Sequence, residues 1–265
     1  MPTIDQNKSL WEREYDWSHG GDEWSKPWGG SDNVWEYVIF PRIKSFLPAR
    51  TIVEIAPGFG RWTQFLKNHC QRLIAIDLSS TCVESCTHRF ADSPHVVVVQ
   101  NDGRSIPIAE NASVDFVFSF DSLVHADAET LGVYVREIAR VLAQDGAAFI
   151  HHSNLGQYRT ILALAGKLPR WALRAAQNAE LLPSLHRRDV SVTAGWFASA
   201  CRQTGLSAAS QELVNWLNRP VYLLDCFSTL KRSPGGPEQV VCNRKFMQEA
   251  EQIRSAHPTR SAVIS

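Results

Sequence analysis

The 265-residue chain lacks a long apolar run, a C-x-x-C pair and an excess of charge of either sign. No stretch approaches the ~18 apolar residues that a membrane-spanning helix needs, and the first residues contain no apolar leader segment. Lys and Arg total 27 and balance the 27 Asp and Glu residues, so no net field attracts nucleic acid. We therefore expect a cytoplasmic protein with neither a nucleic acid nor a membrane as its partner. Its oligomeric state does not follow from the sequence.

The six cysteines also lack the spacing of a zinc site or a disulfide framework. We expect them to be buried or half-buried reduced thiols. Cys82 and Cys86, at positions i and i+4 of a predicted helix, should face a core. The length and the 44% apolar content suit one α/β domain better than two, so residues 1–265 are expected to form a single domain.

What the sequence does contain is an alternation of β-branched apolar runs with segments of helical period. Strands are predicted at 51–55, 72–77, 95–100, 114–120 and 146–151, and helices at 33–47, 60–69, 80–90 and 129–142. Such alternation is typical of right-handed βαβ units, and segments at 207–214 and 225–231 could close the sheet as an antiparallel pair. The predicted fold class is α/β: a doubly wound, mainly parallel sheet with an antiparallel closing strand and helices on both faces.

Two segments interrupt this pattern. Residues 1–35 are rich in Trp, Gly, Ser and Asp, and large indole rings bury area where they can. This segment is either an arm packed over the core or a lid that closes on a ligand, with Trp24 and Trp28 as candidate substrate contacts. Residues 154–190 are predicted to be a helical insertion after the fifth strand that shapes the substrate pocket. Within it, Arg187 and Arg188 favour a solvated basic loop over recognition of a phosphate or carboxylate.

The clearest local feature is residues 51–63, TIVEIAPGFGRWT, which predict a strand, a glycine turn and a helix. This arrangement presents backbone N–H groups to a nucleotide-like ligand. Asp77, Asp102 and Asp121 follow at the ends of the next three strands. Because the carboxyl ends of parallel strands share one rim, these acids should converge on the turn. Asp77 would accept hydrogen bonds from ribose hydroxyls and Asp102 from an adenine amine.

The order of these segments resembles the class I S-adenosylmethionine-dependent methyltransferases over residues 33–155. The similar segments are EIAPGFG (54–60), IAID (74–77), VQNDG (99–103), VDFVFSFDS (114–122) and RVLAQDGAAFIH (140–151). The resemblance implies a Rossmann-like methyltransferase with S-adenosyl-L-methionine as its cofactor. The dinucleotide-binding dehydrogenases fit less well, because Thr63 stands where their third glycine is expected.

The resemblance also implies roles for individual residues. Gly58 and Gly60 would pass close to the methionine part of the cofactor, Glu54 would organise the turn, and the Phe120 backbone would lie near the amino group. The implied cofactor-binding set is Glu54, Ala56, Gly58, Gly60, Asp77, Leu78, Asp102, Gly103 and Phe120. The family's first turn glycine is Ala56 here, which is tolerable if its backbone angle is ordinary.

Methyl transfer requires alignment, exclusion of water and, for many acceptors, a base. His125 and Asp121 are the candidate catalytic residues, with His125 as the general base, although His125 could instead pack against the next helix. At most one of His151 and His152 should point into the site, because strand side chains alternate, and His152 is the candidate substrate contact. A metal site built from Asp121, His125, Asp127 and one of His151 and His152 is less favoured, and no metal is expected.

The expected activity is methyl transfer from S-adenosylmethionine to a small-molecule acceptor. A hydroxyl oxygen, for example of a sugar or a glycosylated metabolite, is the preferred acceptor. N- or C-methylation of a natural product remains open, as does a non-catalytic S-adenosylmethionine-binding partner protein.

Overall fold

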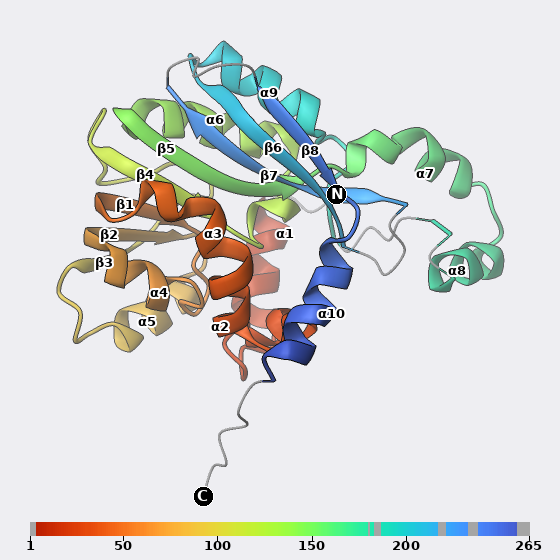
Figure 1. The fold of residues 1–265 in the computed structure, drawn as a ribbon, viewed down its shortest axis with the longest axis horizontal. Helices are drawn as coiled ribbons and strands as arrows, with labels where there is room; N and C mark the ends of the chain where they lie inside the picture. The colour runs from red at the N-terminus through yellow and green to blue at the C-terminus, as the bar shows by residue number, and fades with distance from the viewer. Residues whose placement is uncertain (1–3, 180, 183–186, 217–220, 233–237, 259–265) are drawn as a thin grey trace, which may run out of the picture.

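A computed structural model describes residues 4–179, 181–182, 187–216, 221–232 and 238–258 of the chain. In this described part, one sheet of eight strands has the order β3-β2-β1-β4-β5-β7-β6-β8 (Figure 1). The strands are β1 (Ala49–Ile55), β2 (Cys70–Asp77), β3 (Val96–Gln100), β4 (Val114–Ser119), β5 (Leu142–Ser153), β6 (Ser207–Asn215), β7 (Leu223–Lys231) and β8 (Gln239–Asn243). Strands β1 to β5 are parallel and β7 is antiparallel to both β5 and β6, so the predicted fold class is confirmed.

Helices cover both faces of the sheet. The α-helices of the described part are α1 (Ile4–Ser9), α2 (Ser31–Asn33), α3 (Phe40–Ile43), α4 (Thr63–Leu66), α5 (Ser80–Arg89), α6 (Ala128–Val141), α7 (Arg159–Ala165), α8 (Arg170–Asn178), α9 (Ala194–Gln203) and α10 (Phe246–Ala256), of which α7 and α8 do not lie on the sheet. Helices α6 and α9 lie over one face, whereas α3, α4 and α10 lie over the other (Figure 1). The alternation of side chains along β1 supplies both cores: Val53 and Ile55 face the first layer, and Ile52 faces the second.

The helix predicted at 33–47 runs through Pro41 without ending there. A π-helical segment, Val34–Ile39, separates α2 from α3, and Pro41 lies in the first turn of α3. Proline has no N–H to donate and clashes with the preceding turn of a regular α-helix. A local π-turn changes the hydrogen-bond register just before the ring, so the helical path can continue.

Two other expectations require correction at the sheet edge. No strand is predicted from the sequence at residues 239–243, but β8 pairs with β6 in parallel as the last strand of the sheet. Because four of its five residues are exposed, β8 does not show the alternation of buried and exposed side chains that indicates a strand. Cys242 in β8 is also exposed, whereas the other five cysteines are buried or half-buried free thiols, as expected. No helix in the described ranges is long and apolar enough to cross a membrane.

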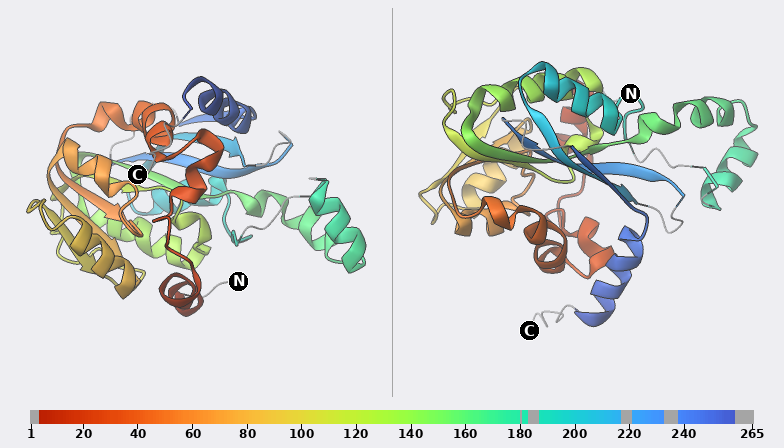
Figure 2. Two further views of the ribbon diagram at one scale, coloured as in Figure 1. Left: turned by 90° about the horizontal axis from the view of Figure 1, so that it is seen from below. Right: turned by 45° about the horizontal axis from the view of Figure 1, so that its top comes forward.

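The two segments outside the alternating pattern have opposite placements. Residues 4–28, which we call the N-terminal arm, pack against the body at the carboxyl ends of the central strands. Helices α7 and α8, which we call the helical hairpin, project away from the body in each of the views in Figure 2. This placement puts the arm, and not the hairpin, over the site.

Candidate functional site

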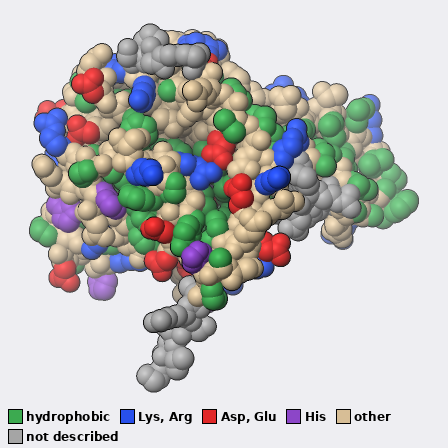
Figure 3. Space-filling view, in the orientation of Figure 1, with side chains coloured by type: hydrophobic (Ala, Val, Ile, Leu, Met, Phe, Trp, Pro, Cys, Tyr) green, Lys and Arg blue, Asp and Glu red, His purple; other side chains and the backbone are tan. Residues whose placement is uncertain are grey.

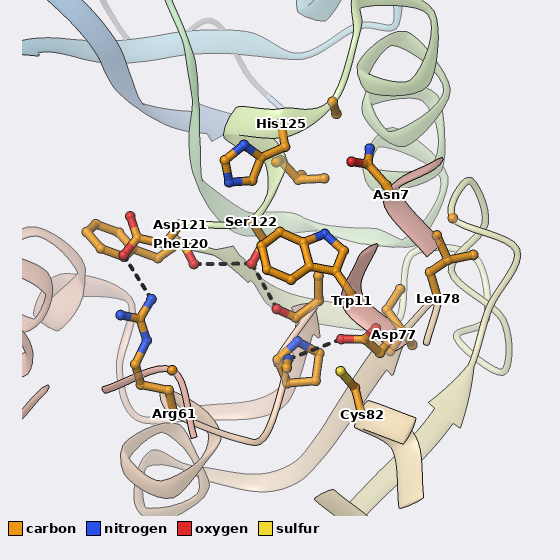
Figure 4. Close-up of a pocket in the computed structure, with 18 of the residues that line it drawn as sticks. Asn7, Trp11, Arg61, Asp77, Leu78, Cys82, Phe120, Asp121, Ser122 and His125 are labelled. Carbon is orange, nitrogen blue, oxygen red and sulfur yellow. Dashed lines mark hydrogen bonds and ion pairs between the residues drawn. The ribbon is translucent and has the colours of Figure 1, made fainter. Parts of the chain in front are cut away.

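A cavity lies at the carboxyl ends of β1, β2 and β4, with the N-terminal arm on its outer side (Figure 4). Its empty space is about 950 Å³, including the part that is open to solvent, which is a size typical of ligand sites. Ligands of doubly wound sheets bind at this edge. The lining residues are Ile4, Asn7, Trp11, Trp17, Gly20, Gly21, Trp24, Ala56, Pro57, Gly58, Arg61, Trp62, Ile76, Asp77, Leu78, Cys82, Asn101, Gly103, Phe120, Asp121, Ser122, Leu123, His125, Ala126, Thr130 and Tyr134.

The turn after β1 forms one wall of the cavity. Ala56 has a φ of +57°, so the condition placed on this alanine is not met, and its left-handed backbone costs roughly 1–2 kcal/mol. Two hydrogen bonds hold it in place: its N–H donates to the Ile76 carbonyl at 2.7 Å, and its carbonyl accepts from Ser122 Oγ at 2.9 Å. Strain that the surroundings enforce in this way is often found at ligand sites.

The two glycines of the turn have different neighbours. A Cβ on Gly58 would lie 2.8 Å from the Trp17 ring of the arm, so this glycine lets the arm approach the turn. A Cβ on Gly60 would lie 2.4 Å from the Phe90 ring, and Gly60 does not line the cavity. Gly60 therefore serves the packing of the turn against α5, and Gly58 is the glycine at the cavity wall.

Asp77, at the end of β2, lines the cavity next to Gly58. Its carboxylate accepts hydrogen bonds from the backbone N–H of Gly58 at 3.1 Å and of Ser79 at 2.9 Å. Burial raises the pKa of Asp77 to about 6 in spite of these bonds. A carboxylate has about four acceptor positions, so two remain for the hydroxyls of a ligand.

Glu54 lies beneath the turn and not in the cavity wall. Its Oε2 accepts a hydrogen bond from Thr63 Oγ1 at 2.6 Å, whereas its Oε1 is buried and has no hydrogen-bond partner among the described residues. Burial raises the pKa of Glu54 to about 8, so this acid is neutral at pH 7. The bond to Thr63 ties the end of β1 to the start of α4.

After β3, Asp102 lies in a different environment from the residues on either side of it. The Asp102 side chain is exposed outside the cavity, and its Oδ1 accepts from the N–H groups of Arg104 and Ser105 at 2.9 Å and 2.7 Å. Asp102 thus stabilises its own turn, which corrects the expectation that it faces the ligand. Asn101 and Gly103 line the cavity in its place, as does Leu78 after β2.

Asp121 follows β4 and lies beside Arg61 and His151. Its carboxylate lies 2.8 Å from Arg61 Nη2 and 3.2 Å from His151 Nδ1. Burial alone would raise the pKa of Asp121, but the charges of Arg61 and His151 outweigh it and hold this pKa below its ordinary value. Its φ of +63° makes Asp121 a second strained residue at the rim. A carboxylate held in this way is better suited to positioning than to taking up a proton.

His151 connects this pair to a second one. Its Nε2 lies 3.4 Å from Asp225 Oδ2, and Asp225 accepts two hydrogen bonds from Arg188, each of 2.6 Å. Burial alone would lower the pKa of His151, but Asp121 and Asp225 outweigh it and raise this pKa. Arg188 is 8% exposed, so the expectation of a solvated loop is wrong for Arg188 and holds only for exposed Arg187. We call Arg61, Asp121, His151, Asp225 and Arg188 the buried charge chain.

His125 lies in the 3-10 turn Leu123–His125 after β4 and lines the cavity. Its Nδ1 is 3.3 Å from the Arg187 carbonyl oxygen, which can only accept, so Nδ1 carries the proton and Nε2 has a lone pair. Burial, together with the charge of Arg188, lowers the pKa of His125 to about 4. The imidazole is therefore neutral at pH 7, and in Figure 4 it lies across the cavity from Asp77, with Trp11 between them.

The arm lines the cavity with aromatic rings. Trp24 is among them, together with Trp11 and Trp17, and Trp17 stacks on Phe59 at 4.5 Å. Trp28 is not: it is 2% exposed and packs against Trp216 and Phe246 in the core, so it cannot meet a substrate there. The indole ring at position 28 anchors the end of the arm.

His152 also lies away from the cavity. It stacks on Phe197 at 4.0 Å and its Nε2 lies 2.8 Å from Ser228 Oγ, on the opposite face of the sheet from His151. The expectation that only one of the two histidines faces the site agrees with this geometry, but the residue near Asp121 is His151. The alternation of β5 permits either phase, and only the tertiary structure distinguishes them.

Several lining residues had no role assigned from the sequence. Arg61, Asn101 and Trp11 are the main ones, and Arg61 had a signal: a charged residue directly after the last turn glycine. Within the described ranges, no group of three His, Cys, Asp or Glu side chains is arranged to hold a metal ion, and Asp127 instead caps α6 through the Thr130 N–H. None of the described residues of 154–190 lines the cavity. Arg187 contacts the lining residue His125 through its backbone carbonyl.

The sequence matches a family described as "Methyltransferase domain" over residues 53–150. Among curated proteins, it is 45% identical over 56 residues to a ribosomal RNA small subunit methyltransferase A of Acidobacterium capsulatum, covering 21% of this chain and 20% of the relative. The same-named protein of Geobacter metallireducens is 36% identical over 55 residues, again covering 21% and 20%. The match thus spans about a fifth of the length of these relatives.

Solved structures show the same fold at low identity. A magnesium protoporphyrin IX methyltransferase of Synechocystis with bound SAH has a TM-score of 0.57 at 15% identity, covering 87% of this chain and 100% of that one. A geranyl diphosphate C-methyltransferase of Streptomyces coelicolor has a TM-score of 0.56 at 12% identity, covering 88% and 98%. These likenesses extend the Rossmann-like fold over most of the chain, beyond the 53–150 match.

Proposed function

The chain contains a methyltransferase domain with the Rossmann-like fold of the class I S-adenosylmethionine-dependent methyltransferases, and on this premise we propose that it methylates a small-molecule acceptor. The observation that carries the proposal is the single cavity wall shared by Gly58, Asp77, Asn101 and Gly103. S-adenosylmethionine, when bound, supplies an activated methyl group on a sulfonium sulfur.

The residues of this wall fit such a cofactor. Asp77 has acceptor positions for ribose hydroxyls, and Gly103 leaves room where a Cβ would lie 3.3 Å from Ile4 and 3.4 Å from Leu78. In place of Asp102, we assign the adenine amine to Asn101 Oδ1, which accepts from the Gly103 N–H at 3.1 Å and keeps a second lone pair, whereas the Asn101 N–H groups donate to Ser105 and Tyr134. Gly58 and the strained Ala56 border the remaining part of the wall, where the methionine portion would lie.

His125 is the residue that we assign to proton removal. A hydroxyl oxygen becomes strongly acidic as it gains a methyl group, so a weak but neutral base is sufficient. The lone pair of Nε2 is available because Nδ1 donates to the Arg187 carbonyl. Asp121 then acts as a positioning residue, since its carboxylate is already occupied by Arg61 and His151.

The rings that cover the cavity support the proposed acceptor class. Trp11, Trp17 and Trp24 surround the side opposite the β-strand ends, and flat aromatic faces suit the ring of a sugar or a planar metabolite. The rings also exclude water from the transferred methyl group. The similarity to ribosomal RNA methyltransferases covers only about a fifth of those proteins, so it does not make RNA the preferred acceptor.

Calorimetric titration of the protein with S-adenosylmethionine tests the cofactor. We expect measurable binding that Asp77→Ala weakens by at least about tenfold, since the variant loses hydrogen bonds to a charged acceptor. Asp102→Ala is the matched control and should bind nearly as well as the wild type. Absence of heat with the wild type, or equal losses in both variants, would contradict the assignment.

Turnover tests the base, once an acceptor has been found by screening hydroxylated metabolites for cofactor-dependent methylation. We expect His125→Ala to lower kcat by about 100-fold or more while cofactor binding stays unchanged. A variant with wild-type kcat would remove His125 from the mechanism. Cofactor binding without any methylated product in a broad screen would favour the non-catalytic alternative.

A further inference from the structure

The helical hairpin is packed against the body of the protein at its base. At that base, Leu155 is fully buried with Tyr222 and Leu224, and the Leu223 N–H donates to Tyr158 Oη at 2.8 Å. The Gly156 N–H donates to the Val192 carbonyl at 2.9 Å. Beyond this base, α7 buries one residue, Ala165, and α8 buries none. The outer part of the hairpin is therefore held out from the body rather than packed on it.

Its outer surface is unusually apolar. Half of the exposed large hydrophobic side chains in the described part of the chain lie in this one hairpin and its exit: Ile161, Leu164, Leu168, Trp171 and Leu181. Trp171 is 76% exposed and Leu164 is 60% exposed. Figure 3 shows hydrophobic side chains gathered on the projecting part of the molecule. An exposed apolar group of this kind is typical of an interaction surface.

Helix α8 is also divided into two faces. At 100° per residue, Arg170, Arg174, Gln177 and Asn178 share one side, and Trp171, Ala172, Leu173, Ala175 and Ala176 share the other. Amphipathic helices normally bury the apolar side against their own protein, but no residue of α8 is buried. Its apolar side is thus only partly covered: Ala172, Leu173 and Ala176 are half-buried, whereas Trp171 is exposed.

The charge of the hairpin is one-sided. Residues 155–181, the hairpin with its exit, contain Arg159, Lys167, Arg170 and Arg174 and a single acid, Glu180. The rest of the chain therefore has 23 basic and 26 acidic residues, so the zero net charge of the whole chain conceals a basic hairpin on an acidic body. An anionic surface attracts this hairpin and repels the remainder, which would orient the molecule with the hairpin toward it.

We propose that the helical hairpin docks on the surface of a bilayer that contains anionic lipids. A basic amphipathic helix with an exposed Trp matches the acyl boundary with its apolar side and the anionic headgroups with its cations. A second copy of the hairpin is a poorer partner, because the pairing would bring eight cations together. The docking is peripheral, lies outside the cavity, and is independent of the proposed methyl transfer.

Co-sedimentation of the full chain with vesicles tests this proposal without cofactor or acceptor. We expect binding to vesicles of phosphatidylcholine with about 30% phosphatidylglycerol, and at least tenfold weaker binding to phosphatidylcholine alone, with the difference falling as salt is added. Each cation near an anionic surface strengthens binding about fivefold, so R170E/R174E should weaken it by more than 25-fold. The apolar variant L164E/W171E should also lose most of the binding.

The matched control is I108E/V240E, which introduces the same charges at two exposed apolar positions away from the hairpin and its base. It should bind anionic vesicles nearly as the wild type does. Thermal unfolding should be unchanged in R170E/R174E and L164E/W171E, because none of the four side chains is buried. Wild-type protein that ignores both vesicle types, or hairpin variants that bind as the control does, would overturn the proposal. A lipid-independent dimer that L164E/W171E abolishes would equally overturn it and assign the face to a second copy.

Discussion

The N-terminal arm and the helical hairpin are both additions to the same sheet, and both carry large apolar side chains, yet they end in opposite environments. Trp28 of the arm is 2% exposed, whereas Trp171 of the hairpin is 76% exposed. The arm finds a complementary surface in the turn after β1, in α5 and in α10. The hairpin finds such a surface only at its base.

Composition alone therefore does not decide whether a segment packs against the body of the protein. In both segments the aromatic and aliphatic side chains would gain from burial, but burial requires a matching face within reach. Each segment is also linked to one end of the buried charge chain: Arg61 contacts Ser25 Oγ of the arm at 3.3 Å, and Arg188 follows the hairpin. The arm therefore completes the cavity, and the hairpin remains available to a partner.

The largest contrast is expected from truncating the two tryptophans. Trp28→Ala should lower the free energy of unfolding by about 4 kcal/mol, because it leaves a cavity in the core formed with Trp216 and Phe246. Trp171→Ala should change it by less than about 0.5 kcal/mol, because little area is buried. Denaturant unfolding followed by circular dichroism measures both. Similar losses of unfolding free energy in the two variants would contradict the difference in packing between the arm and the hairpin.

A second contrast concerns Arg187 and Arg188, which follow the hairpin in the sequence. Arg188→Met should cost about 3 kcal/mol, because it leaves the buried carboxylate of Asp225 without its bidentate partner. Arg187→Met, at the exposed neighbouring position, is the matched control and should be nearly neutral. Replacing both partners in R188M/D225L should recover part of the loss. Equal stability of the two single variants, measured by chemical denaturation, would show that Arg188 does not hold this region.

The third test uses pH to separate the two regions. Glu54, under the cavity wall, has a folded-state pKa of about 8, above its unfolded value of 4.5, so the folded state binds the proton more tightly and stability falls as pH rises between these values. From pH 6 to 7.5, the wild type should lose about 2 kcal/mol relative to Glu54→Gln. Glu54 lies outside the hairpin, so vesicle binding should not change over the same range. If the free energy of unfolding changed equally with pH in the wild type and in Glu54→Gln, the assignment to Glu54 would be refuted.

The smallest effect is expected where the arm meets α5. The Glu12 carboxylate accepts from the Ser80 N–H at 3.0 Å at the first turn of that helix. Glu12→Ala should cost about 1 kcal/mol and should speed limited proteolysis of the arm. Glu14→Ala, at an exposed arm position, controls for the loss of an acid. If both variants are cleaved at the wild-type rate, the arm is held by its rings alone.

Much of the sheet could be predicted from the sequence, because the apolar runs of β1 to β5 are local signals. The turn at 56–60 and Asp77 were likewise readable, since a strand end in a parallel sheet has a known place. Asp102 was misplaced because a strand-end acid can either face a ligand or close its own turn, and the local sequence is the same in both cases. His152 was misplaced for a similar reason, because the alternation of side chains along a strand does not say which set faces the site.

The sequence by itself determined the alternating α/β order, the glycine turn and the family resemblance, all of which depend on residues close together in the chain. Only the tertiary structure decided that Trp28 is core while Trp24 lines the cavity, and that Arg188 pairs with Asp225 at 37 positions' distance. It also decided that the arm packs whereas the hairpin projects. These outcomes depend on which surfaces meet, and complementary surfaces are formed by segments that are distant in sequence.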